Sequence, residues 1–270
     1  MPFTNDQFLP EPQDPAIKEI EKFIKSKKNV SELISKGLRQ AFDEVIDGPR
    51  TGRFKIEQLE KTEKTYIGTK VEIIIRTLLA LPRGTTLDNS ICGYEVDTKF
   101  SLTGAWMIPR EAIDQICMLI KANDNLGTFS VGLLRTTLNN LTQGKNQDGK
   151  RSVSSQGKEN ITWIIKNENL PRNILLDLPP DIREKIMSPT SGVQRIKALF
   201  TNVTNQIIPR TVIEQVAQQK DALKRAREMK KVLADSNYKI VCAAYAIDQK
   251  YFIEQGFENF KDDDWLSIKL

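Results

Sequence analysis

Two acidic residues and a lysine alternate along the segment YEVDTKFS, in which one residue separates Glu95 from Asp97 and Asp97 from Lys99. In an extended strand, side chains two residues apart lie on the same face of the chain. This spacing would therefore bring two carboxylates and an ammonium group together. The same alternation is typical of a charged strand that faces water, and the spacing alone leaves both interpretations open.

A carboxylate next to an ammonium group is suited to the hydrolysis of a phosphodiester. That reaction needs an activated water, neutralised phosphoryl oxygens and a stabilised leaving oxygen, and Mg²⁺ held by a few carboxylates can supply all three. We expect Asp97 to bind the metal and Lys99 to orient the water or to hold a phosphoryl oxygen. Asp88, in the preceding segment LPRGTTLDNS, and Glu72 further upstream could complete the site.

The absence of histidine from the whole chain excludes several other chemistries. Ser-His-Asp hydrolysis, Cys-His catalysis and His-ligated zinc sites all require an imidazole. Any hydrolytic reaction must therefore use carboxylates, lysine and a hard metal ion.

A strand and a helix are predicted to position these residues. The strand covers Ile91–Leu102. The helix covers Tyr66–Leu81, where apolar residues recur at helical spacing before Pro82 ends the pattern. Glu72 lies at the border of the apolar stripe, where its carboxylate would be partly covered.

The rest of the first half alternates between helical and extended patterns, which favours an α/β core. Residues 1–12 are expected to be irregular, and the Gly-, Ser- and Lys-rich segment 142–160 to be a mobile loop. The predicted helices are Pro15–Lys25, Ser31–Ile46 and Arg110–Lys121, and the predicted strands are Thr128–Arg135 and Ile161–Lys166.

The second half begins with helical patterns and ends in a strand pattern. Helices are predicted over Gly192–Asn205 and over Pro209–Ala234, the latter allowing a break, with a strand over Tyr238–Ala246. This order is typical of a winged helix-turn-helix. We therefore predict a nuclease-like domain over residues 1–168 and a mostly helical, winged-helix-like domain over residues 169–270.

Positive charge is concentrated in part of this second half. The formal net charge is +5, and residues 191–231 hold nine Lys/Arg against three Asp/Glu, whereas residues 232–270 hold four against seven. Lys220, Lys224, Arg227 and Lys231 would form one stripe on a helix, a surface suited to DNA phosphates, with Arg210 and Arg225 extending it. A solvated helix face would show the same stripe.

Cysteine usage and hydropathy predict a cytoplasmic protein. Cys92, Cys117 and Cys242 are odd in number and widely spaced, which favours buried, reduced thiols. No apolar run approaches the length of a membrane span, and no apolar segment typical of a secretion signal follows Met1.

Long ordered segments of the chain resemble the NaeI family of type II (type IIE) restriction endonucleases, a branch of the PD-(D/E)xK nucleases. The resemblance extends from about Gly37 to Arg227, and the part after Lys231 looks abbreviated. The matching segments are GYEVDTKFSLTGAWMIPREA, NDNLGTFSVGLLR, NENLPRNILLDLP, SGVQRIKALF and IPRTVIEQVAQQKDALKRAR.

The resemblance implies a role for each candidate residue. The family's helix glutamate matches Glu72, its two aspartates match Asp88 and Asp97, and its lysine matches Lys99. The three acids would bind one or two Mg²⁺ ions. The family pattern assigns no role to Glu95, for which a supporting or solvated position is favoured.

The resemblance also implies partners. A homodimer would cut both strands of double-stranded DNA, the second domain would bind another DNA copy as an effector, and a DNA methyltransferase would be the genetic partner. Two alternatives remain: a nicking repair nuclease of the same broad fold, and a DNA-binding regulator without turnover.

Overall fold

The protein folds into two compact units. The computed structural model describes residues 14–144 and 146–270, so the predicted irregular arm, residues 1–12, lies outside the described residues. The first unit comprises the residues up to Ala41 and Thr65–Pro171, and the second comprises Phe42–Lys64 and Arg172–Leu270. Unlike the predicted contiguous domains, the second unit includes a segment from the first quarter of the chain.

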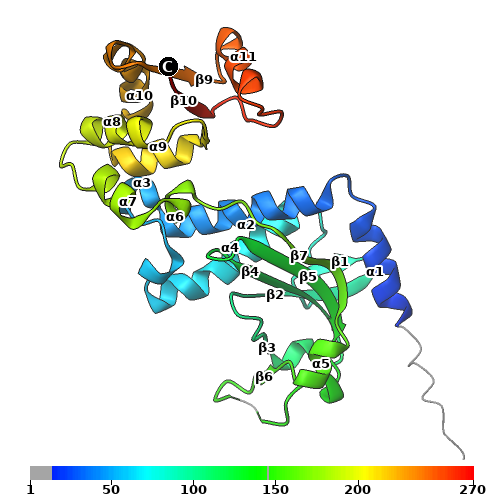
Figure 1. The fold of residues 1–270 in the computed structure, drawn as a ribbon. Helices are drawn as coiled ribbons and strands as arrows, with labels where there is room; N and C mark the ends of the chain where they lie inside the picture. Colours follow the sequence, from blue (N-terminus) through cyan, green and yellow to red (C-terminus); the bar gives the residue numbers. More distant parts are fainter. Residues whose placement is uncertain (1–13, 145) are drawn as a thin grey trace, which may run out of the picture. The chain divides into compact units, whose positions relative to one another are not determined.

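The first unit is built on a five-stranded mixed sheet, in which strands β2, β4, β5 and β7 run side by side (Figure 1). The strand order is β1-β2-β4-β5-β7; β2 and β4 are parallel, and the other neighbours are antiparallel. This confirms the predicted α/β fold class. The strands are β1 (Asn89–Ile91), β2 (Tyr94–Ser101), β4 (Ile116–Asn123), β5 (Thr128–Arg135) and β7 (Thr162–Asn169).

A tight hairpin, rather than one continuous strand, leads into the candidate site. Cys92 and Gly93, between β1 and β2, have φ values of 53° and 84°. Positive φ at both central residues is characteristic of a type I′ turn, whose twist matches that of the two strands. Cys92 is exposed on this turn, so the prediction of a buried thiol is wrong there, whereas Cys117 and Cys242 are buried and all three are free.

Three long helices accompany the sheet and confirm the sequence predictions within a few residues. Helix α1 (Pro15–Lys25) packs against β5 and β7, and Asp14 caps its first turn by accepting the Ala16 N–H at 2.9 Å. Helices α2 (Val30–Ile46) and α4 (Lys61–Leu78) each begin in one unit and end in the other. They approach closely at Gly37, where a Cβ atom would lie 2.5 Å from Leu78.

The predicted helix over Arg110–Lys121 is wrong. A single 3-10 turn, η2 (Arg110–Ala112), is followed by strand β4 in the centre of the sheet. Residues Ile116–Ile120 are all buried. A short, continuous apolar run fits a strand that is covered on both faces, although Ile113, Ile116 and Ile120 also match helical spacing.

The predicted mobile loop over residues 142–160 is also wrong in part, because it contains regular structure. Strand β6 (Arg151–Ser152) pairs with β3 (Met107–Ile108), and α5 (Ser155–Glu159) follows with Ser154 as its N-cap. Val153 is buried together with Trp106, Leu141 and Ile161. Sequence composition did not reveal this anchoring, because backbone hydrogen bonds such as that from Val153 N–H to the Trp106 carbonyl also hold the segment.

The second unit has the element order of a winged helix. Helix α8 (Gly192–Asn202) is followed by β8 (Ile207–Ile208), α9 (Arg210–Ala217), α10 (Ala222–Val232), β9 (Tyr238–Cys242) and β10 (Trp265–Lys269), and the sheet order is β8-β10-β9. Helix α11 (Ala246–Glu254) is inserted between β9 and β10. The remaining elements are α3 (Gly48–Thr51), η1 (Ile56–Gln58), η3 (Leu138–Asn140, in the first unit), α6 (Ile174–Asp177), α7 (Pro180–Met187) and η4 (Ala234–Ser236).

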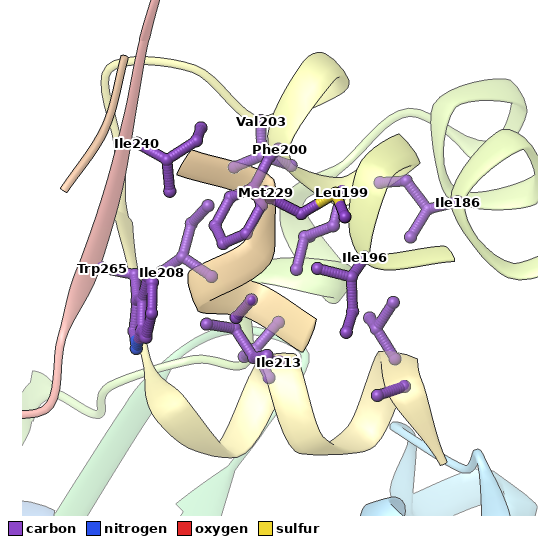
Figure 2. Close-up of a cluster of buried hydrophobic side chains, with 14 of the residues drawn as sticks. Ile186, Ile196, Leu199, Phe200, Val203, Ile208, Ile213, Met229, Ile240 and Trp265 are labelled. Atoms are coloured by element: carbon purple, nitrogen blue, oxygen red, sulfur yellow. The ribbon is translucent and has the colours of Figure 1, made fainter. Parts of the chain in front are cut away.

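One buried cluster holds the helices and the small sheet of this unit together (Figure 2). Phe200 from α8 and Trp265 from β10 lie with ring centroids 6.0 Å apart. Side chains from α7, α9, α10 and β9 fill the same cluster, through Ile186, Ile213, Met229 and Ile240. No helix among residues 14–144 and 146–270 is both long and apolar enough to cross a membrane.

Candidate active site

Asp97 and Lys99 form a close ion pair on strand β2. The Lys99 ammonium lies 2.8 Å from Asp97 Oδ1 and 2.7 Å from Oδ2. Asp97 is 4% exposed, whereas about a quarter of the Lys99 side chain remains accessible. The strand alternation therefore does what the spacing predicts: it places an acid and an amine side by side at a partly accessible position.

Asp88 joins this pair from the loop that precedes β1. Its Oδ2 accepts a hydrogen bond from the backbone N–H of Thr98 at 2.7 Å, which orients the carboxylate beside β2. Asp88 contributes to the raised pKa of both Asp97 and Glu72, so its carboxylate lies near both of these acids. It is therefore the acid that connects the strand to helix α4.

Glu72 reaches the site from helix α4, as predicted. Arg76, one turn further along the helix, donates to Glu72 Oε1 at 2.8 Å. About a quarter of the Glu72 side chain is exposed, and its carboxylate experiences the charges of both Asp88 and Lys99. The structure thus brings all four predicted residues, Glu72, Asp88, Asp97 and Lys99, into one cluster.

Burial and crowding change the protonation of this cluster. Burial raises the pKa of Asp97 to about 7 against the opposing pull of Lys99, and burial followed by the charge of Asp88 raises the pKa of Glu72. Burial by itself would lower the pKa of Lys99, but the contact with Asp97 outweighs it, and the pKa is raised. Carboxylates with raised pKa values gain strongly from a nearby cation, which favours their charged form.

The chemistry of the donor set fits a hard divalent cation. Carboxylate oxygens are the ligands that Mg²⁺ prefers, and Mg²⁺ keeps several waters, so two acids and a substrate phosphate can hold it. In the described part of the chain, however, no three Asp, Glu, Cys or His side chains are arranged as a ready-made cation site. Asp88 lies near both Asp97 and Glu72, and Lys99 is paired with Asp97.

Cys117 lies beneath the site, a position that sequence reasoning did not assign to it. It pairs in register with Asp97 across the parallel strands β2 and β4. Its Sγ is 3.9 Å from Asp97 Oδ2 and 3.9 Å from Thr136 Oγ1. Burial raises the pKa of Cys117 far above the ordinary thiol value. The thiol next to the Asp97 carboxylate is therefore uncharged. Only the cross-strand register, which the sequence does not reveal, could have identified it.

Glu95 supports the loop that carries Asp88. Its carboxylate accepts the backbone N–H groups of Thr85 at 2.8 Å, Thr86 at 3.0 Å and Leu87 at 2.7 Å. These three hydrogen bonds lower the pKa of Glu95. Of the two positions that the sequence favoured for Glu95, supporting or solvated, the structure shows the supporting one.

The six basic residues predicted to bind DNA occupy different environments in the second unit. Lys224, Arg227 and Lys231 are exposed on α10. Arg225 is engaged by Asp221 at 2.9 Å and by Glu228 at 3.0 Å. Arg210 begins α9 and pairs with Glu214 at 2.8 Å.

The prediction that Lys220 shares a helical stripe with Lys224 is wrong. Helix α9 ends at Ala217, and the cap residue Gln218 adopts a left-handed conformation with φ of 51°. Lys220 therefore lies in the turn between α9 and α10, exposed but outside either helix. The apolar spacing continues across the turn because both helices pack on the same core.

Comparison with known proteins identifies the family of the chain. The family model described as restriction endonuclease NaeI matches residues 19–270, beyond Gly37–Arg227 at both ends. The type II restriction enzyme NaeI of Lentzea aerocolonigenes is 39% identical over 198 residues, which cover 70% of this chain. The same alignment spans 62% of that relative, less than two thirds of its length. With the site residues and the mixed sheet in place, the match shows that this chain belongs to the NaeI restriction endonuclease family.

Proposed function

We propose that this protein is a Mg²⁺-dependent, site-specific endonuclease that makes double-strand cuts in DNA. The observation that carries the proposal is the cluster of Glu72, Asp88, Asp97 and Lys99 in the first unit. Membership of a restriction endonuclease family supports it. The similar enzyme from Lentzea aerocolonigenes is named a type II restriction enzyme, and that activity enters here as part of the proposal.

The residues of the cluster divide the chemistry between them. Asp88 and Asp97, with Glu72 at the border, would hold Mg²⁺, which when bound neutralises phosphoryl oxygens and favours ionisation of water. Lys99 is partly accessible and paired with Asp97, so it can donate a hydrogen bond to a phosphoryl oxygen or to the attacking water. Arg76 holds the carboxylate of Glu72 in place.

The second unit is proposed to bind a second copy of the DNA. Its winged-helix element order makes α10 the helix that follows the turn, the position of a recognition helix. Lys224, Arg227 and Lys231 are exposed on this helix, which supports contact with DNA phosphates. Binding there would stimulate cleavage in the first unit.

Cutting both strands requires two active sites, which supports a homodimer on the DNA. A cell that holds such a nuclease must protect its own sites, and a DNA methyltransferase with the same specificity is the genetic partner that we propose.

Digestion of a plasmid of known sequence with Mg²⁺ tests the proposal directly. We expect linear DNA whose ends map to one sequence, and no cleavage with a chelator or with Asp97→Ala, which should still bind DNA. A product that is nicked but never linear would favour a nicking repair nuclease. Binding without cleavage at any Mg²⁺ concentration would favour a DNA-binding regulator.

A further inference from the structure

The loop that precedes strand β1 is fastened to β2 by a single carboxylate. Glu95 accepts three consecutive backbone N–H groups, those of Thr85, Thr86 and Leu87, at 2.7–3.0 Å. Hydrogen bonds from neutral donors to an ionised acceptor are roughly twice as strong as neutral pairs. Both Glu95 oxygens are used, Oε1 by Thr85 and Oε2 by the other two, so this carboxylate is committed to the loop.

The fastened loop ends at Asp88. Asp88 follows Leu87 directly, and its own carboxylate accepts the Thr98 N–H at 2.7 Å. Strand β2 therefore acts at two points: Glu95 fixes the backbone of the three residues before Asp88, and the Thr98 N–H orients the Asp88 side chain. The same strand carries Asp97 and Lys99. The distance between the two candidate metal-binding aspartates is thus set within one strand and the loop bound to it.

Gly84 allows this close approach. A Cβ atom at Gly84 would lie 2.5 Å from the carbonyl oxygen of Leu87 and 2.6 Å from Glu95 Oε2. Both distances are shorter than any side chain tolerates, so a larger residue would push the loop away from Glu95. Glycine at position 84 therefore allows the loop to lie close enough to bind Glu95.

We propose that Glu95 is a positioning residue that sets the affinity of the active site for Mg²⁺ by holding Asp88 next to Asp97. The inference rests on the proposed function for the identity of the metal-binding site. Glu95 touches neither metal nor DNA in this role; it acts through Asp88. Residues that orient metal ligands typically change metal affinity by about 10–100-fold when they are replaced.

Three variants disturb the hydrogen bonds between Glu95 and the loop in different ways. Glu95→Ala removes both acceptor oxygens, and Glu95→Gln keeps one of them. Gly84→Ala forces the loop outward while leaving Glu95 intact. Asn123→Ala is the matched control: Asn123 Oδ1 also accepts a loop N–H, that of Leu126 at 2.9 Å, in the turn between β4 and β5.

Hydrogen exchange and metal affinity are the two readouts. Amides of Thr85, Thr86 and Leu87 should exchange faster in Glu95→Ala and Gly84→Ala than in the wild-type protein. The Mg²⁺ concentration for half-maximal thermal stabilisation without DNA, and for half-maximal cleavage, should rise about tenfold or more in both variants. For Glu95→Gln this Mg²⁺ concentration should lie between those of the wild type and Glu95→Ala, and for Asn123→Ala it should equal that of the wild type. At saturating Mg²⁺ the cleavage rate of every variant should recover to within about threefold of wild type, because the reacting groups are intact.

A double-mutant cycle with Asp88→Asn separates positioning from general support. If Glu95 acts through Asp88, Glu95→Ala should not lower Mg²⁺ affinity further in the Asp88→Asn background. Additive losses, or wild-type Mg²⁺ dependence in folded Glu95→Ala, Glu95→Gln and Gly84→Ala, would overturn the inference. If the wild-type protein binds Mg²⁺ but cuts no DNA, the proposed function fails while the affinity measurements still decide the role of Glu95.

Discussion

Three acids, Glu72, Asp88 and Asp97, crowd into the candidate site and are only partly balanced by Lys99 and Arg76. Asp97 is 4% exposed and stands over the neutral thiol of Cys117. An ionised carboxylate is unfavourable in such surroundings unless a cation compensates it. The raised pKa values of Asp97 and Glu72 have the same physical cause, and they fit the cation-binding role that we propose for these residues.

Replacing Asp97 with asparagine should stabilise the metal-free protein at high pH. The folded state keeps a proton on Asp97 up to a pKa of about 7, whereas the unfolded chain loses it near 3.8, so stability falls as pH rises between these values. Asp97→Asn removes this decrease in the free energy of unfolding, which amounts to roughly 4 kcal/mol at most. The net gain is smaller, because Lys99 loses its ion pair with Asp97. We expect a higher unfolding temperature than wild type at pH 8 in chelator, and a gain less than half as large at pH 5.

Asp181→Asn provides the control for this pH experiment. Asp181 is about two thirds exposed and lies 3.9 Å from Lys185, so its replacement should change the unfolding temperature little at either pH. An Asp97→Asn protein that is less stable than wild type at pH 8 would contradict the buried-charge argument.

Among the elements, the turn between α9 and α10 depends on one buried cation. Arg195 of α8 donates to the carbonyl oxygens of Val216 at 2.6 Å and Ala217 at 2.8 Å, at the end of α9. It also donates to those of Pro189 and Thr190 at 2.8 and 3.0 Å. Arg195 is one of the nine basic residues in the positive segment, yet it is buried and contributes nothing to a DNA surface.

Arg195→Met should therefore destabilise the second unit. The substitution leaves four carbonyl groups, two of them buried, without this donor, for which a loss on the order of 3 kcal/mol is expected. Thermal or denaturant unfolding measures it. Lys197→Met, at an exposed position on the same helix, is the control and should change stability by less than about 0.5 kcal/mol.

The exposed stripe on α10 makes a prediction about salt. Lys224→Ala combined with Arg227→Ala should flatten the dependence of log K for DNA binding on log salt by up to about 2, since each phosphate contact contributes about 0.9. Arg225→Ala should have the smaller effect, because Asp221 and Glu228 already engage that guanidinium. Fluorescence anisotropy over a salt series measures the slopes.

The control for the stripe is the pair Lys185→Ala and Lys197→Ala, which removes two exposed lysines from α7 and α8. If this pair flattens the slope as much as the α10 pair, the proposed role of α10 is lost.

Element types were predictable where one periodicity dominated. Helix α1 and strand β5 have their predicted bounds, because a helical stripe or a short run between turn residues leaves one solution. Strand β4 was missed because a fully buried strand shows no alternation. That the four candidate residues lie together was predictable from spacing and family resemblance, whereas the position of Cys117 and the Glu95 hydrogen bonds depend on register and loop conformation, which the sequence does not encode locally.

On the scale of the whole molecule, the proposed function predicts an assembly. We expect sedimentation of the complex to give the mass of two chains, each of 30.7 kDa, plus the mass of the bound DNA. A plasmid with one site should become linear without accumulation of the nicked form, and an added oligonucleotide that carries the site should accelerate cutting. A monomeric complex that accumulates nicked circles would contradict this prediction.

The second unit takes residues 42–64 from the early part of the chain, and Gln215 on α9 donates to the backbone carbonyl of Arg53 while accepting from Asn173 at 2.7 Å. This has a consequence for how such proteins diversify. A single genetic crossover near residue 171 would join residues 172–270 of one relative to residues 42–64 of another. The contact surfaces of the two segments would no longer match, and further substitutions would be needed to restore their packing. Exchange of sequence between relatives should therefore succeed mainly when both stretches move together.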